Sequence, residues 1–426
     1  MDYEQIDMGS YHLHLIKTKK FKTITVEVNF RREVVKEEIT MRNLLKSVLL
    51  TTSQNFHSER ELVQETENLY DLKLISSNMR IGNYSNLSFK IKFLNEKYTE
   101  DSMNEYSISF LMDILFRPDV ILHCFSKDVV AKCKKKLEKS ICKLKDSKLK
   151  YTLFQLLATT VDKPYAYNYY GDIDDLGKIT PENLYEYYLS VLADDVVDIF
   201  VVGDFVSEDM RDIFKKYVKI KTFKKIKNNI LVSELTPRKR IKKVVEYDVA
   251  NGSQLTALCT LNGLTDFERK YVLLVYSEML GGSSNSLLFD TVREKNSYAY
   301  YVNSSAKAYD NVMLIYAGIE SGNSQNVLKL IRKTLQDISK GNFSDDILNN
   351  SKETLISSIQ ASTDNPTGII NTFYAMSLVH SDSFDIRIQK IKMVTRDDVV
   401  ALSKKIMLHT VYLLEGTSEG ILYEND

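Results

Sequence analysis

The residues most suited to chemistry lie in the stretch LFDTVREKNSYAY, residues 288–300, which follows a glycine-rich turn, GGSSNS. This stretch places Arg293 seven residues before Tyr300. Arginine offers a permanently charged fork and tyrosine a neutral O–H donor, and both can stabilise a carbonyl that becomes an oxyanion. A purely structural role is the alternative, with Arg293 at a helix C-terminus and Tyr300 as a half-buried strand aromatic. The stretch alone leaves both interpretations open.

Histidine-based metal chemistry has little support elsewhere in the chain. The six histidines are His12, His14, His57, His123, His380 and His409. His12 and His14 would share one face of a strand, but two ligands do not make a zinc site and no third ligand is near in sequence. His57 and Glu61 are four residues apart at a helix start, where we expect a structural role. H-E-x-x-H, H-x-x-E-H, G-x-S-x-G, P-loop and G-x-G-x-x-G motifs are all absent from the sequence.

The cysteines also form no reactive cluster. They are Cys124, Cys133, Cys142 and Cys259, without C-x-x-C spacing. The first three recur every nine residues, and nine residues are 2.5 helical turns, so neighbouring members would face opposite ways. Four thiols in 426 residues favour a reducing compartment.

Composition predicts a soluble globular protein of ordinary type. Lys+Arg and Asp+Glu are both 57, so the formal net charge is zero and gives no argument for nucleic acid or a membrane surface as partner. No segment approaches about 18 uninterrupted apolar residues, and the N-terminus MDYEQIDMGS lacks the apolar core of a signal peptide. We therefore expect a cytoplasmic protein that binds neither nucleic acid nor membrane.

An internal repeat organises the elements that would position these residues. FSKDVVAKCKKKLEKSI (125–141) matches FSDDILNNSKETLISSI (343–359) at seven of 17 positions with an offset of 218 (343 − 125). ITPENL (179–184) similarly matches VTRDDV (394–399), and each begins a helix behind a Thr suited to cap it. Strand patterns precede these helices and one follows them in each half. The sequence predicts a duplicated α+β unit, each copy a mostly antiparallel sheet covered by helices.

The repeat divides the chain into two domains joined by a basic segment. Residues 219–243 are rich in Lys and Arg, with Glu234 as their single acid. We expect an exposed linker here, or alternatively a basic rim that attracts an acidic partner. The predicted organisation is an N-terminal domain at 1–218, the linker at 219–243 and a C-terminal domain at 244–426.

LGGSSNSLLFDTVREKNSYAY, together with the duplication, resembles the C-terminal signature of the insulinase/pitrilysin class of zinc metallopeptidases. The likeness is to its small bacterial members, in which one chain carries two homologous domains. It implies that the domains form a clam-shell, and that zinc is bound by an H-x-x-E-H motif on the first helix of the N-terminal domain. A glutamate on a later helix would be the third ligand.

This sequence departs from the class at every one of those positions. The alignment places Asn43 and Ser47 where the histidines stand and Lys46 where the catalytic glutamate stands, and the third ligand falls near Cys133. Asn and Ser are poor zinc ligands, and a lysine cannot take a proton from zinc-bound water as a carboxylate does. We therefore expect no metal on this chain and no proteolysis by the chain alone.

The resemblance implies what the retained residues would do. In the class, the arginine and tyrosine reach the zinc site of the N-terminal domain and contact the bound peptide, and some relatives work as paired subunits. Arg293 and Tyr300 are then expected to bind a peptide substrate at a zinc site on a homologous partner in a heterodimer. The alternative is an inactive peptide-binding or scaffold protein of the same fold. Self-association of the isolated chain stays open.

Overall fold

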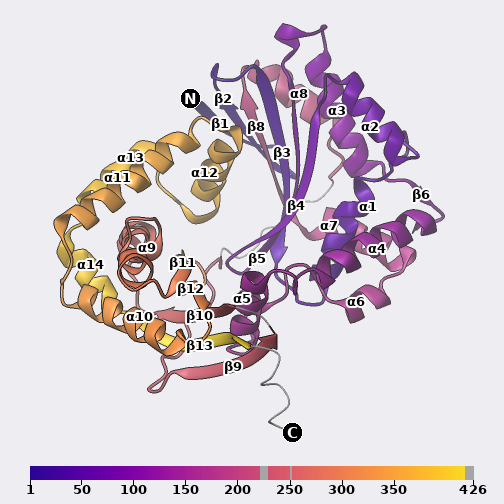
Figure 1. The fold of residues 1–426 in the computed structure, drawn as a ribbon. Helices are drawn as coiled ribbons and strands as arrows, with labels where there is room; N and C mark the ends of the chain where they lie inside the picture. The colour runs from indigo at the N-terminus through magenta and orange to yellow at the C-terminus, as the bar shows by residue number, and fades with distance from the viewer. Residues whose placement is uncertain (221–228, 250–251, 418–426) are drawn as a thin grey trace. The chain divides into compact units, whose positions relative to one another are not determined.

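The computed structural model describes residues 1–220, 229–249 and 252–417, shown as a ribbon in Figure 1. These residues belong to two compact units, each built from three pieces of the chain. Unit 1 comprises Met1–Lys143, Asn168–Asn229 and Asp364–Tyr374. Unit 2 comprises Leu144–Tyr167, Ile230–Thr363 and Ala375–Asp426.

Unit 1 contains a six-stranded sheet in the order β1-β2-β8-β3-β5-β4. Its strands are β1 Asp2–Asp7, β2 His12–Lys17, β3 Thr23–Glu33, β4 Lys73–Ile81, β5 Tyr84–Leu94 and β8 Val196–Gly203. The pair β2/β8 is parallel and the other neighbours are antiparallel. β6 Val120–Ile121 and β7 Cys124–Phe125 form a separate small hairpin.

Helices cover the apolar face of this sheet. They are α1 Glu38–Leu49, α2 Glu59–Asn68, α3 Met103–Phe116, α4 Lys127–Cys142, α6 Ile173–Lys178, α7 Pro181–Asp194 and α8 Ser207–Tyr217. Alternate strand residues such as Val26, Phe89 and Val201 are fully buried in the core beneath them. Successive residues of a strand face opposite sides of the sheet, so this burial pattern gives the alternation of apolar residues from which the sequence predicts the strands.

The opposite face of the sheet in unit 1 is polar and still buried. Residues 364–374, the start of α12 Pro366–Val379, belong to this unit. Tyr374 donates a hydrogen bond to Asn86 Oδ1 at 3.0 Å, and Lys90 donates one to Thr367 Oγ1 at 3.2 Å. Hydrogen bonds therefore hold this segment where an apolar core would otherwise be expected.

Unit 2 contains a five-stranded sheet in the order β11-β12-β10-β13-β9. Its strands are β9 Lys242–Val249, β10 Gly252–Leu261, β11 Ala299–Lys307, β12 Val312–Glu320 and β13 Ile406–Thr417. Its helices are α5 Lys148–Ala158, α9 Leu273–Gly281, α10 Ser324–Ser339, α11 Asp345–Ser362, α13 Phe384–Met393 and α14 Arg396–Ser403. α5 packs on one face through Leu156, and the core on the other face includes Leu255 and Val411.

The two sheets share one topology, which confirms the predicted duplicated α+β class. From β9, the order β9-β13-β10-β12-β11 repeats the order β2-β8-β3-β5-β4, and β9/β13 is parallel as β2/β8 is. The caps repeat as well, because Thr180 and Thr395 each close a capping box at the start of α7 and α14. β1 has no counterpart among the described strands of unit 2.

The compact units do not follow the contiguous halves 1–218 and 244–426. The helix after the repeated helix is exchanged, since α5 lies in unit 2 and the start of α12 lies in unit 1. The two helices begin 218 residues apart (366 − 148), as the repeat requires. Each sequence half therefore contributes a helix to the other unit.

The basic segment 219–243 differs from the exposed linker that we expected. Residues 221–228 lie outside the described part of the chain, but Ile230, Val232 and Leu235 are buried. Asn311 of unit 2 donates a hydrogen bond to the backbone oxygen of Val232 at 2.7 Å. Buried apolar side chains thus anchor this segment to unit 2, although its composition is basic.

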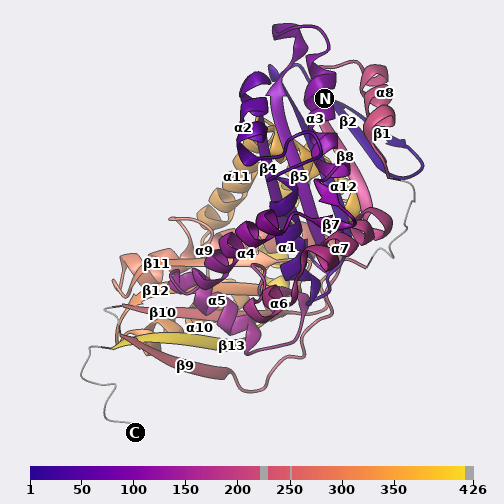
Figure 2. The ribbon, with the colours of Figure 1, turned by 90° about the vertical axis from the view of Figure 1, so that its right-hand side faces the viewer.

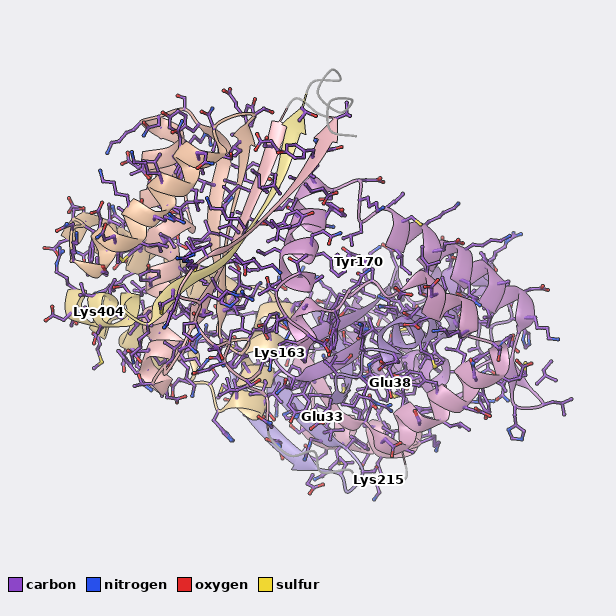
Figure 3. The ribbon with its side chains drawn as sticks, turned by 90° about the horizontal axis from the view of Figure 1, so that it is seen from below. Glu33, Glu38, Lys163, Tyr170, Lys215 and Lys404 are labelled. Carbon is purple, nitrogen blue, oxygen red and sulfur yellow. The ribbon has the colours of Figure 1, made fainter. Side chains whose placement is uncertain are left out.

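Charged side chains of both signs project from the ribbon, among them Glu33, Lys215 and Lys404 (Figure 3). Each of these three is exposed. In the described ranges, no helix is both long and apolar enough to cross a membrane.

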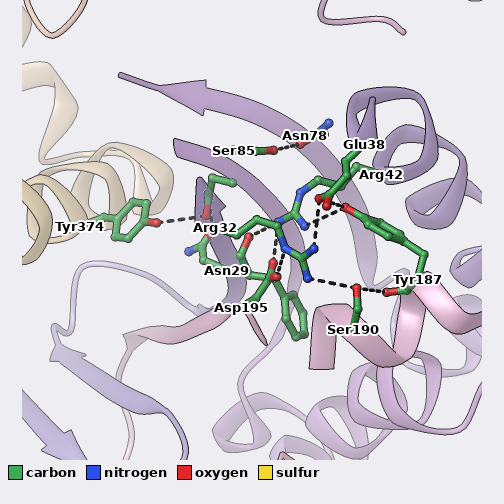
Figure 4. A network of polar contacts seen from close by, with 12 residues as sticks. Asn29, Arg32, Glu38, Arg42, Asn78, Ser85, Tyr187, Ser190, Asp195 and Tyr374 are labelled. Atoms are coloured by element: carbon green, nitrogen blue, oxygen red, sulfur yellow. Dashed lines mark hydrogen bonds and ion pairs between the residues drawn. The ribbon is translucent and has the colours of Figure 1, made fainter. Parts of the chain in front are cut away.

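A buried carboxylate, Asp195, holds the first helix of unit 1 in place (Figure 4). Asp195 follows α7 and accepts a hydrogen bond from Arg42 of α1 at 2.7 Å and one from Arg32 of β3. Arg42 also donates to the backbone oxygen of Phe30 at 2.7 Å, and its side chain is 1% exposed. A charge buried to this degree is tolerated only while it stays paired.

We predict that Asp195→Ala lowers the free energy of unfolding by about 3–5 kcal/mol, because it leaves Arg42 buried without its carboxylate. Urea unfolding followed by circular dichroism measures the effect. Asp209→Ala, which removes an exposed carboxylate of α8, is the control and should change stability little. Equal losses in the two variants would contradict this role of Asp195.

Candidate functional site

Arg293 and Tyr300 line the same small pocket of unit 2. The pocket has a volume of about 370 Å³ and is lined by Arg293, Glu294, Ser297, Ala299, Tyr300 and Glu320. Between the two residues, the helix ends in a turn where Ser297 adopts a positive φ of 54° and its N–H bonds to Arg293 O at 2.9 Å. β11 then begins at Ala299. The local description from sequence, a helix end followed by a strand, therefore holds, and the reversal brings both side chains to one pocket.

Arg293 lies in a π-helical turn, Phe289–Glu294. Its guanidinium carbon is 4.7 Å from the centre of the Phe289 ring, which supports the side chain by a cation–π contact. Its ion pair with Glu294 is long, with Nε 3.9 Å from Oε1, and the side chain is 46% exposed. The Phe289 ring thus supports one face of the Arg293 guanidinium, and much of the side chain remains exposed to solvent. Single π turns within helices occur frequently at functional sites.

Tyr300 is the extra residue of a β-bulge. Ala299 pairs with Ile319 and Tyr301 with Gly318, so Tyr300 has no partner of its own on β12. Its side chain is 61% exposed. A bulge turns a side chain away from the regular alternation and is common beside active sites. The bulge shifts the alternation by one residue, which is why Ala299 and Val302, three residues apart, are both buried on either side of the exposed Tyr300.

Two glycines make this geometry possible. A Cβ on Gly318 would lie 2.4 Å from the Tyr301 ring, so the glycine leaves room for Tyr301 to cross β12 and donate to Gln254. A Cβ on Gly281 would lie 2.7 Å from the backbone nitrogen of Ser304, so this glycine lets α9 end against β11. The glycine-rich turn before the Arg–Tyr stretch thus has a steric cause.

On α1 of unit 1, the positions aligned with the metal motif carry side chains that serve the fold. Asn43 is 4% exposed and its Nδ2 donates to Tyr169 O at 2.8 Å. Ser47 Oγ donates to Asn43 O at 3.2 Å, one turn back along the helix. An amide and a hydroxyl used in this way do not fit a zinc ion, which takes imidazole, thiolate or carboxylate ligands.

Lys46 and Cys133 are the other two positions aligned with the metal motif, and neither side chain suits a metal site. Lys46 is half-buried, burial lowers its pKa, and no carboxylate of the described residues pairs with it. Cys133 of α4 is 1% exposed, and its Sγ is 3.5 Å from Thr51 Oγ1, which itself donates to Ser47 O at 2.7 Å. Burial also raises the pKa of the Cys133 thiol, which disfavours the thiolate that metals bind. α1 and α4 meet here without the donors that a zinc site needs.

The two histidines of β2 have a structural partner that sequence reasoning missed. Asp198 of β8 lies 3.0 Å from His12 Nδ1 and 3.4 Å from His14 Nε2. The hydrogen bond to Asp198 raises the pKa of His12. Across the described ranges, no three His, Cys, Asp or Glu side chains are grouped to hold a metal ion. The sequence alone does not reveal this pairing, because 186 residues separate Asp198 from His12.

The two carboxylates of the Arg–Tyr pocket were also missed. Glu294 adjoins Arg293 in sequence, but Glu320 enters the pocket through the pairing of β11 with β12, which the sequence does not specify.

Taken together, the fold and the site define a class: a duplicated α+β protein with an exposed Arg–Tyr pocket in one unit and, in the other, a first helix whose residues serve packing. The family model described as "Peptidase M16 inactive domain" matches residues 178–355. The chain is 29% identical over 415 residues to "Probable inactive metalloprotease YmfF" of Bacillus subtilis (strain 168), covering 96% of each chain.

Solved structures share the fold over nearly the whole chain. A conserved protein from Enterococcus faecalis V583 superposes with a TM-score of 0.91 at 25% identity, over 98% of this chain and 100% of that one. A peptidase M16 inactive domain from Pseudomonas fluorescens shares the fold, with a TM-score of 0.80 at 15% identity over 98% of each chain. By these similarities the chain resembles M16-type (insulinase/pitrilysin) peptidase homologues, and its sequence lacks the H-x-x-E-H zinc motif.

Lys46 gives a test of how the α1 positions are used. We predict that Lys46→Met raises the free energy of unfolding at pH 7 by up to about 1 kcal/mol, because it removes a half-buried ammonium. The unfolded chain holds this proton up to its ordinary pKa of 10.5, above the lowered folded pKa. The cost of Lys46 therefore shrinks as pH rises toward 10.5, and so should the gain from the substitution.

Denaturant unfolding between pH 7 and pH 10.5 measures both effects. The control is Lys329→Met, which replaces an exposed lysine of α10 and should give no comparable pH-dependent difference. A gain that is constant over this pH range would mean that the charge of Lys46 is not what costs stability.

Proposed function

We propose that this chain is a non-catalytic subunit that presents Arg293 and Tyr300 to a peptide bound at the zinc site of a homologous partner chain. The observation that carries the proposal is the contrast between the two sets of motif residues. The Arg–Tyr pair is exposed in one pocket, while Asn43 of α1 is buried and hydrogen-bonded within the fold.

The pocket chemistry suits stabilisation of a peptide carbonyl. The fork of Arg293 remains 46% exposed because its ion pair with Glu294 is long, so its N–H groups are available to an oxygen acceptor. The exposed hydroxyl of Tyr300 adds a neutral donor. Donors fixed in advance at the position of a developing oxyanion lower the barrier, and loss of one typically costs about 10²–10³ in kcat.

Zinc enters this proposal as the partner's metal. On this chain, Asn43, Ser47 and Cys133 offer an amide, a hydroxyl and a buried thiol, so the proposal assigns no metal-dependent step to them. The partner's zinc would polarise the scissile carbonyl and activate water. The role left to this chain is to bind and orient the peptide and to donate hydrogen bonds to its carbonyl.

The test is reconstitution with a homologous chain that keeps H-x-x-E-H. We expect the mixture to cleave peptides that neither chain cleaves alone. Arg293→Ala and Tyr300→Phe in this chain should each lower kcat by about 10²-fold or more, because each removes a donor to the developing charge. A continuous assay with a quenched fluorescent peptide measures kcat and KM separately.

Matched controls separate this effect from a general surface change. Tyr106→Phe alters a tyrosine that is also 61% exposed but lies on α3 of unit 1, and Arg60→Ala removes an exposed arginine of α2. Both should leave kcat unchanged. If the Arg293 and Tyr300 variants support cleavage as well as the wild type, the proposed role is wrong. Peptide binding without cleavage in any mixture would instead favour the scaffold alternative.

A further inference from the structure

β9, the last strand of the sheet in unit 2, has an open side. Its neighbour on one side is β13, and no described strand pairs with it on the other. Figure 2 shows β9 as the outermost strand of the stack β11-β12-β10-β13-β9. An edge strand offers unpaired N–H and C=O groups to any chain that can add a strand.

The duplication shows what this edge accepts. β9 corresponds to β2 of unit 1, and β2 carries β1 on the equivalent side. β1 and β2 pair antiparallel over six residues, from Asp2 opposite Lys17 to Asp7 opposite His12. Among the described residues, no antiparallel strand takes the same topological position in unit 2.

The side chains of β9 divide into two rows. Lys242, Val244, Glu246 and Asp248 face α5, where Tyr151 donates to Glu246 at 2.9 Å and Lys148 pairs with Asp248 at 3.2 Å. The other row is exposed and mainly apolar. It includes Val245 at 49%, Tyr247 at 59% and Val249 at 49% exposure. An apolar row on a strand with an open edge is unusual for a surface that meets only water.

We propose that β9 pairs antiparallel with β9 of a second copy of this chain, with Val245 opposite Val245 at the two-fold axis. The strand sequence, KKVVEYDV, has its cations at one end and its acids at the other. In antiparallel pairing about Val245, residues whose numbers sum to 490 are opposite. Lys242 then faces Asp248 and Lys243 faces Tyr247, and each of these pairs occurs twice.

Other arrangements of two β9 strands are poorer. Parallel pairing in register would set the lysines of one copy beside those of the other. Centring the pair on Glu246 would oppose two carboxylates, and centring it on Val244 would leave only residues 242–246 of the strand paired. A register shifted by one residue would make the numbers of opposite residues sum to an odd value. The exposed apolar row of one copy would then lie on the opposite face of the joined sheet from that of the other copy. Charge and length together therefore select the register centred on Val245.

The expected assembly is weak and depends on concentration. Pairing of one strand from each copy gives less than the standard interface area, as in transient complexes. Sedimentation velocity should show a monomer–dimer equilibrium for the wild type that shifts with concentration. Val245→Lys, at an exposed position, should abolish the dimer because it opposes two ammonium groups, and its circular dichroism melt should match the wild type.

Cysteine cross-linking tests the register directly. In a background with Cys142→Ser and Cys124→Ser, which leaves the buried Cys133 and Cys259, Val245→Cys should form a disulfide-linked dimer with oxidised glutathione. Residues opposite each other in antiparallel strands have Cα atoms about 4.5–5.5 Å apart, within disulfide range. Lys243→Cys would lie about 13 Å from its own copy and Val249→Cys about 26 Å, so neither should cross-link comparably.

Each outcome decides the proposal. A concentration-dependent dimer that Val245→Lys removes, with cross-linking confined to position 245, supports it. A wild type that stays monomeric, or equal cross-linking at positions 243, 245 and 249, overturns it. A dimer seen only after deletion of residues 418–426 also overturns it, because the occupant of the edge would then be the chain's own end. These readouts need no peptidase activity.

Discussion

The buried carboxylate of Asp195 is the constraint on which the arrangement of unit 1 depends. It joins the start of β8 to α1 through Arg42 and to β3 through Arg32. Charges removed from water are stable only in a complete set of partners, so these three elements are fixed together. α1 then holds Asn43 against the backbone of Tyr169. α1, the helix aligned with the metal motif, is therefore a structural helix in this chain. Asp195 binds its Arg42, and the backbone of Tyr169 accepts a hydrogen bond from its Asn43.

The backbone irregularities at Arg293 and Tyr300 lie in unit 2. Arg293 sits in a π-helical turn and Tyr300 in a β-bulge, and Gly318 makes room for the ring beside the bulge. π turns and β-bulges both occur frequently beside functional sites. The irregular backbone of unit 2 and the regular, hydrogen-bonded α1 of unit 1 are the two features on which the proposed subunit role rests.

Patterns that are local in sequence were predictable, and those that depend on pairing were not. The Thr180 and Thr395 caps, the strand alternation and the repeated helix follow from short-range spacing. The exchange of α5 and α12 does not, because amphipathic spacing specifies a helix but not which sheet it covers. The bulge at Tyr300 depends on the register of β11 against β12, and Asp198 reaches His12 only through β2/β8 pairing. For the same reason the sequence did not predict Glu320 as a pocket residue, because it reaches the pocket only through the pairing of β11 with β12.

Each of the two duplicated sheets has an edge strand whose backbone groups need a partner, and the two units differ in how that edge is covered. In unit 1 the N-terminal strand β1 covers β2, whereas in unit 2 the described chain reaches β9 through the segment anchored by Val232 and Leu235 and adds no strand before it. β9 and β11 are opposite edges of one sheet, and Tyr300 lies on β11. A partner strand on β9 would therefore be separated by four strands (β9, β13, β10 and β12) from β11, the edge strand that bears Tyr300. Self-association and peptide contact can use the two edges of a single sheet without competing.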